Sequence, residues 1–145
     1  MRKYWLDGVV VTVGEPTIHN DLSSFLCKIK DAGFPVKLDT NGSYSKVLEE
    51  VIKNGLVDFV AMDIKTIFDP EKYKAVTGTA ADNIIERVRH SLNILRDSQV
   101  AYQLWTTVYP EYHSTEIIST LTEMFEKENY ALQEFRAGDI INSYK

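Results

Sequence analysis

The chain has 145 residues, of which 44% are hydrophobic and 26% charged, as in one soluble globular domain. Its formal net charge of −5 argues against general nucleic-acid binding, which needs a basic surface. The sequence holds no run of about 18 apolar residues that could span a membrane and no secretory signal near its start, so we expect a cytoplasmic protein.

Short apolar runs alternate with segments of helical period along the whole chain. Five runs are predicted as strands: residues 8–13 (Gly8 to Val13), 36–38, 59–62, 102–108 and 131–135. Several lack polar alternation, which is typical of parallel strands covered on both faces. Four apolar stripes at helical spacing predict helices between them: Leu22, Phe25, Leu26 and Ile29; Leu48, Val51 and Ile52; Ile84, Ile85, Val88, Leu92 and Leu95; Ile117, Ile118, Leu121, Met124 and Phe125.

Helix-end residues support these assignments. Asn20 or Asp21 could cap the first helix, Asp82 the third and Ser114 the fourth, while Gly55 is a plausible stop for the second. The polar segment at residues 66–81 is expected to form a loop or a short fifth helix over one end of the sheet.

Alternating strands and helices predict an α/β fold with parallel strands joined by right-handed crossovers. About five strands and four or five helices are too few for a closed (β/α)₈ barrel. A partial, TIM-barrel-like (β/α) barrel or an open sheet remains, built as a single domain over residues 1–145. The first strand would lie at an edge, where an apolar strand invites pairing with another chain.

Polar residues follow every predicted strand, and in parallel sheets these ends meet on one side. The groups in chain order are Gly14, Glu15 and Pro16; Asp39, Thr40, Asn41 and Gly42; Asp63 and Lys65; Thr106, Thr107 and His113; Gln133 and Arg136. Carboxylates and an ammonium at one rim could hold a zwitterion or a ribose.

A purely structural interpretation stays open for each member of this set. Asp, Asn and Gly are common turn residues, and an exposed Asp63–Lys65 pair would contribute under about 1 kcal/mol. The three histidines lack metal-ligand spacing. Cys27 is the single cysteine, so it can form no internal disulfide and cannot alone hold an iron–sulfur cluster.

The segments "GVVVTVGEPT", "VKLDTNGS", "VDFVAMDIK", "YQLWTTVYP" and "LQEFRAG", in this order and spacing, resemble the radical S-adenosylmethionine (radical SAM) activating enzymes. The resemblance is to the branch that activates glycyl-radical enzymes, above all the activating proteins of anaerobic ribonucleoside-triphosphate reductase, with pyruvate formate-lyase activases close by. It extends over nearly the whole chain.

The resemblance implies a partial (β/α)₆ barrel whose CxxxCxxC loop holds a [4Fe–4S] cluster. S-adenosylmethionine binds that cluster and yields a 5′-deoxyadenosyl radical, which takes hydrogen from a glycine of a partner enzyme. By motif match, the backbone at Gly14, Glu15 and Pro16 meets the amino group of the cofactor. Asp39 and Asn41 face its methionine end, while Asp63 and Lys65 contact its ribose and carboxylate.

The sequence departs from the family at several positions. CxxxCxxC and the first βα unit are absent, Val13 stands where the family has a glycine, and Trp105 stands where it often has an arginine. We therefore expect an N-terminally truncated domain that alone binds no [4Fe–4S] cluster, has no catalytic or metal-ligating residues of its own, and binds S-adenosylmethionine weakly.

Two other hypotheses remain. The chain could be a non-redox binding or assembly module that holds a nucleotide-like ligand or a partner chain, or a fragment of a gene product that has lost its N-terminal part. A glycyl-radical enzyme is the partner that the resemblance implies. The edge at residues 8–13 predicts a homodimer whose interface includes Tyr4 and Trp5.

Overall fold

The structure is a computed structural model that describes residues 6–12, 14–79 and 83–135. Within these ranges it contains one five-stranded sheet, five α-helices and a short 3₁₀ helix. In chain order the elements are β1 (Val9–Val11), η1 (Pro16–Ile18), α1 (Leu22–Asp31), β2 (Val36–Thr40), α2 (Ser45–Lys53), β3 (Phe59–Asp63), α3 (Pro70–Thr77), α4 (Ile84–Asp97), β4 (Ala101–Val108), α5 (Thr115–Met124) and β5 (Tyr130–Glu134).

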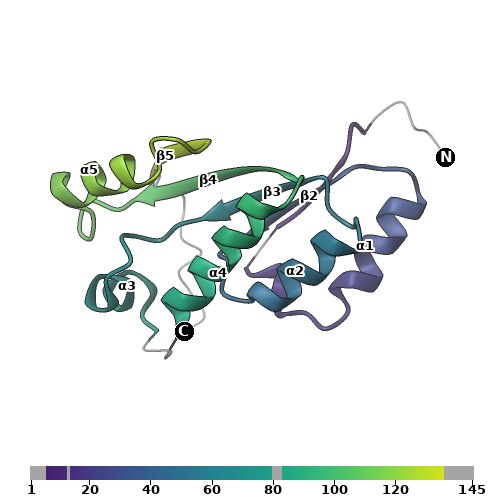
Figure 1. The fold of residues 1–145 in the computed structure, drawn as a ribbon, viewed down its shortest axis with the longest axis horizontal. Coiled ribbons are helices and arrows are strands. Elements are labelled where there is room, and N and C mark those ends of the chain that lie inside the picture. The colour runs from purple at the N-terminus through teal and green to yellow at the C-terminus, as the bar shows by residue number, and fades with distance from the viewer. Residues whose placement is uncertain (1–5, 13, 80–82, 136–145) are drawn as a thin grey trace, which may run out of the picture.

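The strands are all parallel, and their order in the sheet is the same as their order in the chain, β1-β2-β3-β4-β5. Because the order never reverses, right-handed crossovers place successive helices on the same face of the sheet, as in a (β/α) barrel. Figure 1 shows α1, α2 and α4 along one side of the strands. This architecture confirms the predicted α/β partial barrel and the edge position of the first strand.

The core lies between this helical layer and the sheet. In β2, Val36, Leu38 and Thr40 are buried toward the helices, whereas Lys37 and Asp39 are half-buried on the opposite face. Leucines from several elements are fully buried in this layer: Leu26, Leu38, Leu48, Leu95, Leu104 and Leu121. Each contributes about 1.5–3 kcal/mol through burial. In the described part of the chain, no helix lies along the opposite face of the sheet, which displays the polar side chains of Lys37 and Asp39. We call it the helix-free face.

The strands match their predicted positions with small shifts. The first ends at Val11 rather than Val13, which lies outside the described residues. The second and third extend to Thr40 and Asp63, so both Asp39 and Asp63 belong to strands and not to the turns that follow. Asp39 pairs with a residue of β3 and Asp63 with a residue of β4, so strand pairing holds the backbone of both carboxylates in place.

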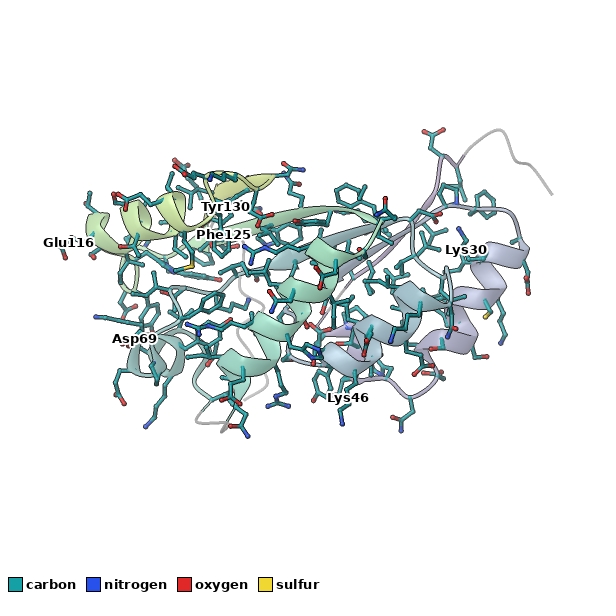
Figure 2. All side chains as sticks on the ribbon, in the orientation of Figure 1. Lys30, Lys46, Asp69, Glu116, Phe125 and Tyr130 are labelled. Atoms are coloured by element: carbon teal, nitrogen blue, oxygen red, sulfur yellow. The ribbon has the colours of Figure 1, made fainter. Side chains whose placement is uncertain are left out.

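The segment at residues 66–81 contains the short helix that was one of its two predicted forms. The Asp69 side chain accepts a hydrogen bond of 2.9 Å from the Lys72 N–H at the start of α3, and Gly78 ends the helix at a φ of +66°. Figure 2 places Asp69 and Glu116 at the same end of the molecule, far from Lys30 at the other end of the strands.

The other helix ends agree in part with the sequence. Ser114 caps α5 through the Ile117 N–H, and Gly55 follows α2 at a φ of +65°. Asp21 occupies the N-cap of α1 without a side-chain cap bond. The N-cap of α4 is Asn83 rather than Asp82, which lies outside the described residues.

Two residues of the predicted apolar stripes are exposed. Phe25 is 49% exposed and Met124 is 39% exposed. Both lie at the margin of a helical stripe, where the spacing of apolar residues does not distinguish a buried side chain from an exposed one. Among the described residues, no helix is long and apolar enough to cross a bilayer.

Candidate functional site

Glu15 joins the end of the first strand to the end of β2. Its Oε2 accepts a hydrogen bond of 2.6 Å from the Asn41 N–H, and its Oε1 accepts one of 2.7 Å from the Thr40 hydroxyl. The same Oε1 accepts bonds from the N–H (3.1 Å) and the hydroxyl of Thr17. Pro16 opens the 3₁₀ helix η1, whose N-cap is Glu15. The glycine, carboxylate and proline at this strand end therefore build a fixed loop.

Gly14 makes the entry to that loop possible. Its φ of +62° lies in the left-handed region, where residues with a side chain are strained. Gly14 is exposed and Pro16 is buried. The Glu15 carboxylate is fully engaged with protein donors, so the part of this loop that remains for a ligand is its backbone.

The loop after β2 is held by local hydrogen bonds. Thr40 Oγ1 accepts from the Gly42 N–H at 3.1 Å, and Asn41 Oδ1 accepts from the Ser43 N–H at 2.9 Å. Ser91 of α4 donates its hydroxyl to the Gly42 carbonyl at 2.7 Å. The turn that sequence reasoning left open as a structural interpretation is thus real, and it fixes the position of Asn41.

Asp39 lies on the helix-free face with Lys37 beside it. The Lys37 Nζ is 3.1 Å from Asp39 Oδ1 and 5.7 Å from the centre of the Trp105 ring. Asp39 Oδ1 is out of contact with solvent and yet has no partner with hydrogen-bond geometry. The contact to Lys37 is close enough for charge attraction, but the direction of approach is wrong for a hydrogen bond, and we regard the two as a loose ion pair.

Asp63 and Lys65 form a second pair on the same face. The Lys65 Nζ is 2.5 Å from Asp63 Oδ2, while Asp63 Oδ1 is buried without a hydrogen-bond partner. Asp63 is the register neighbour of Trp105 in β4, so the two side chains lie side by side. The face therefore offers two carboxylates, each with one buried oxygen left unpaired, and two ammonium groups.

A cavity of about 470 Å³ opens at the carboxyl ends of the strands. Glu15, Asn41 and Lys65 line it together with Tyr73 of α3 and Arg87 of α4. The structure thus brings three of the predicted site residues to one cavity. Asp39 and Asp63 do not line it, but Asp63 is joined to it through Lys65. A second cavity of about 500 Å³, between α3 and α4, has none of the predicted site residues in its wall.

Tyr73 was not identified by the sequence analysis. It is 2% exposed, and its hydroxyl has no hydrogen bond of normal geometry. Burial raises the pKa of Tyr73 well above its usual range, and this effect outweighs the nearby Lys65 backbone, which lowers it. The hydroxyl therefore stays protonated and can donate to an acceptor in the cavity. The helix α3 is short and mostly polar, so its sequence does not indicate that Tyr73 is buried.

His113 is a buried structural residue, one of the alternatives left open for it. Its Nδ1 accepts from the Tyr109 N–H at 3.0 Å, which assigns the ring proton to Nε2, and Nε2 donates to the Lys65 carbonyl at 2.9 Å. His113 thereby fixes the backbone of Lys65. Within the described ranges, no three His, Cys, Asp or Glu side chains gather as a metal site, and Cys27 is exposed on α1.

Other expected contributors lie outside the described residues. These are Val13, which follows β1, Arg136, which follows β5, and the two aromatic residues Tyr4 and Trp5.

Sequence comparison identifies relatives over most of the chain. A protein from Methanocaldococcus jannaschii named as a glycyl-radical enzyme activating enzyme is 33% identical over 135 residues, which are 92% of this chain and 56% of the relative. A protein from Pyrococcus horikoshii named as a GTP 3′,8-cyclase is 32% identical over 59% of this chain and 28% of its own length. The chain thus spans about half, or less, of these relatives. No protein-family model matches it.

Solved structures share the fold at low sequence identity. A structure of TYW1 with a lysine-pyruvate adduct bound matches 92% of this chain and 43% of its own, with a TM-score of 0.73 and 18% identity. A domain of pyruvate-formate lyase-activating enzyme from Bacteroides vulgatus matches 91% of this chain and 81% of its own, with a TM-score of 0.66 and 16% identity. The relatives, these neighbours and the sequential parallel sheet agree: the chain belongs to the radical SAM superfamily.

Proposed function

We propose that this chain carries the S-adenosylmethionine-binding surface of a radical SAM domain of the type that activates glycyl-radical enzymes. One observation carries the proposal: Asp39 and Asp63 each keep a buried carboxylate oxygen without a hydrogen-bond partner, beside Lys65 on the helix-free face. Buried polar atoms without partners are rare in folded proteins and call for an explanation. A bound ligand that brings donors to both carboxylates is such an explanation.

The charges of this surface fit the charges of S-adenosylmethionine. The ligand carries an ammonium, a sulfonium and a carboxylate, and the surface presents two carboxylates and the ammonium groups of Lys37 and Lys65. Asp39 and Asn41 would hold the methionine end, and Asp63 and Lys65 the ribose and carboxylate. The backbone at Gly14, Glu15 and Pro16 would meet the amino group. When bound to a reduced cluster, this cofactor supplies a 5′-deoxyadenosyl radical.

The residues of this chain do not fit the [4Fe–4S] cluster of the family. Such a cluster is held by neighbouring thiolates, and the sequence has one cysteine, exposed on α1. We therefore assign no step of radical chemistry to this chain alone. Anaerobic reconstitution followed by iron counting and a search for 5′-deoxyadenosine tests this. Stoichiometric cluster with its visible absorption would contradict it.

Calorimetry with S-adenosylmethionine tests the binding surface. We expect weak binding by the wild type, and a loss of about tenfold in affinity in Lys65→Ala, equivalent to one charge-assisted hydrogen bond of about 1.5 kcal/mol. The matched control is Lys53→Ala, which removes a lysine from an exposed i,i+4 ion pair on α2. Tight binding that is indifferent to Lys65 would show that the ligand does not use this surface.

A second candidate function is that of an assembly module, favoured by the open edge of β1. In the described part of the chain, β1 pairs with β2 alone, and Val10 is 52% exposed. The Val9 N–H donates to the Pro35 carbonyl at 2.9 Å. Because successive N–H groups of a strand point in opposite directions, the Val10 N–H points away from β2, toward the open edge of the sheet. We propose that residues 8–13 pair with the same strand of a second copy. A glycyl-radical enzyme is the alternative partner.

Light scattering on Val10→Pro tests this edge. Proline removes the outward N–H and leaves the β1–β2 ladder intact, so we expect a dimeric wild type and a monomeric variant. Val10→Thr keeps the N–H and should remain dimeric. A wild type that stays monomeric at high concentration would refute the homodimer.

A further inference from the structure

Lys37, Asp39 and Trp105 together have the composition of a cation site. The site consists of a carboxylate oxygen and an aromatic face, with an ammonium held between them at 3.1 Å from Asp39 Oδ1 and 5.7 Å from the Trp105 ring centre. Carboxylates and indole faces are groups that attract organic cations. The cation in this site belongs to the protein itself.

The Lys37 side chain can move away from Asp39 at little cost. Its side chain is 38% exposed, whereas that of Asp39 is 19% exposed and its Oδ1 is out of contact with solvent. A lysine carries its charge on a flexible stem, and an exposed ion pair is weak. The contact also lacks hydrogen-bond geometry, in contrast to the Lys65–Asp63 pair, whose atoms are 2.5 Å apart in a hydrogen bond.

We propose that Lys37 is an internal competitor for a cation position formed by Asp39 and Trp105, and that an ammonium or sulfonium group of a ligand binds there by displacing it. Lys37 thus weakens the binding of any organic cation that enters this position. The competition lowers the affinity for such a ligand by about two- to fivefold, the worth of an exposed ion pair. Where the ligand is S-adenosylmethionine, the inference rests on the function proposed above.

A ligand-free measurement tests the competition. In a Trp5→Phe background, Trp105 is the remaining indole, and caesium ions quench its fluorescence by collision. Acrylamide is a neutral quencher and serves as the reference. We expect Lys37→Met to raise the ratio of the caesium quenching constant to the acrylamide quenching constant about two- to fivefold, because the small cation can then reach Asp39. Lys37→Arg should match the wild type. Adding Asp39→Asn to Lys37→Met should abolish the gain.

The control variant for charge is Lys53→Met. It removes one positive charge, as Lys37→Met does, but takes it from an exposed ion pair on α2. A ratio in Lys37→Met that equals the ratio in Lys53→Met would overturn the inference. Thermal melts followed by circular dichroism establish that each variant is folded.

Calorimetry on the same variants separates this inference from the function it rests on. We expect Lys37→Met to bind S-adenosylmethionine about two- to fivefold more tightly than Lys53→Met does. S-adenosylhomocysteine keeps the ammonium and lacks the sulfonium, so an equal gain with it assigns the position to the ammonium. Binding without any gain overturns the role of Lys37 and leaves the proposed function standing. A gain in caesium quenching without S-adenosylmethionine binding supports the role of Lys37 and refutes the proposed function.

Discussion

Replacing Gly42 with alanine should destabilise the protein more than the same change at any exposed left-handed glycine. The φ of Gly42 is +73°, and a Cβ there would lie 2.9 Å from Met62 Sδ and 3.3 Å from Ser91 Cβ. The left-handed conformation costs alanine about 1–2 kcal/mol, partly offset by about 0.4–1 kcal/mol from a less flexible unfolded chain. Forcing the methyl group into a packed site adds about 1–3 kcal/mol.

Gly55→Ala is the matched control, because Gly55 has a φ of +65° and no atom within 4 Å of a new Cβ. Urea unfolding should show a loss of about 2–4 kcal/mol in the free energy of unfolding for Gly42→Ala and about 1 kcal/mol for Gly55→Ala. Equal losses in the two variants would refute the close packing of the loop after β2 against β3 and α4.

Three further outcomes are expected. Glu15→Ala should lower the free energy of unfolding in urea by about 2–4 kcal/mol, because four donors, among them the Asn41 N–H at 2.6 Å, lose their acceptor. Burial acts to raise the pKa of Asp58, but hydrogen bonds from Lys30 and a backbone N–H outweigh it and lower that pKa. Its contribution to stability is therefore complete above about pH 4 and is lost as the pH falls further, so acid unfolding of Asp58→Asn should be less steep. Burial is the larger cause and a hydrogen bond to a glutamate the smaller one that together raise the pKa of Tyr102 to about 12. Stability is lost as the pH rises from about 10 through this value, and ultraviolet titration of Tyr102→Phe should lack this late phenolate.

The architecture could be predicted because period and order are local properties of the sequence. Alternating apolar runs and helical stripes define a parallel α/β chain, and each strand was found within a few residues of its predicted position. The buried faces of the helices were less predictable. Phe25 and Met124 are exposed although their spacing fits a buried face, because burial depends on which neighbouring element packs there.

The sequence predicted which residues lie at the site better than it predicted the hydrogen bonds and ion pairs that they form. Glu15, Asn41 and Lys65 meet at one cavity, as strand ends of a parallel sheet should. The sequence did not indicate that the Glu15 carboxylate would be engaged by Asn41 and Thr40, nor that Lys37 would pair with Asp39. The Glu15 contacts depend on the pairing of β1 with β2, which brings together strand ends about 25 residues apart in the chain. Lys37 and Asp39 lie two residues apart on one face of β2, but that spacing alone does not show that the lysine turns toward the carboxylate.

The most direct test of the account is a titration of the labelled protein with S-adenosylmethionine, followed by amide and indole chemical shifts in nuclear magnetic resonance spectra. The account predicts saturable shifts at the backbone amides of Glu15, Asn41 and Lys65 and at the indole N–H of Trp105, reduced in Asp63→Asn. Shifts confined to the second cavity, around Lys74 and Arg89, or no shifts at millimolar ligand concentrations, would contradict it.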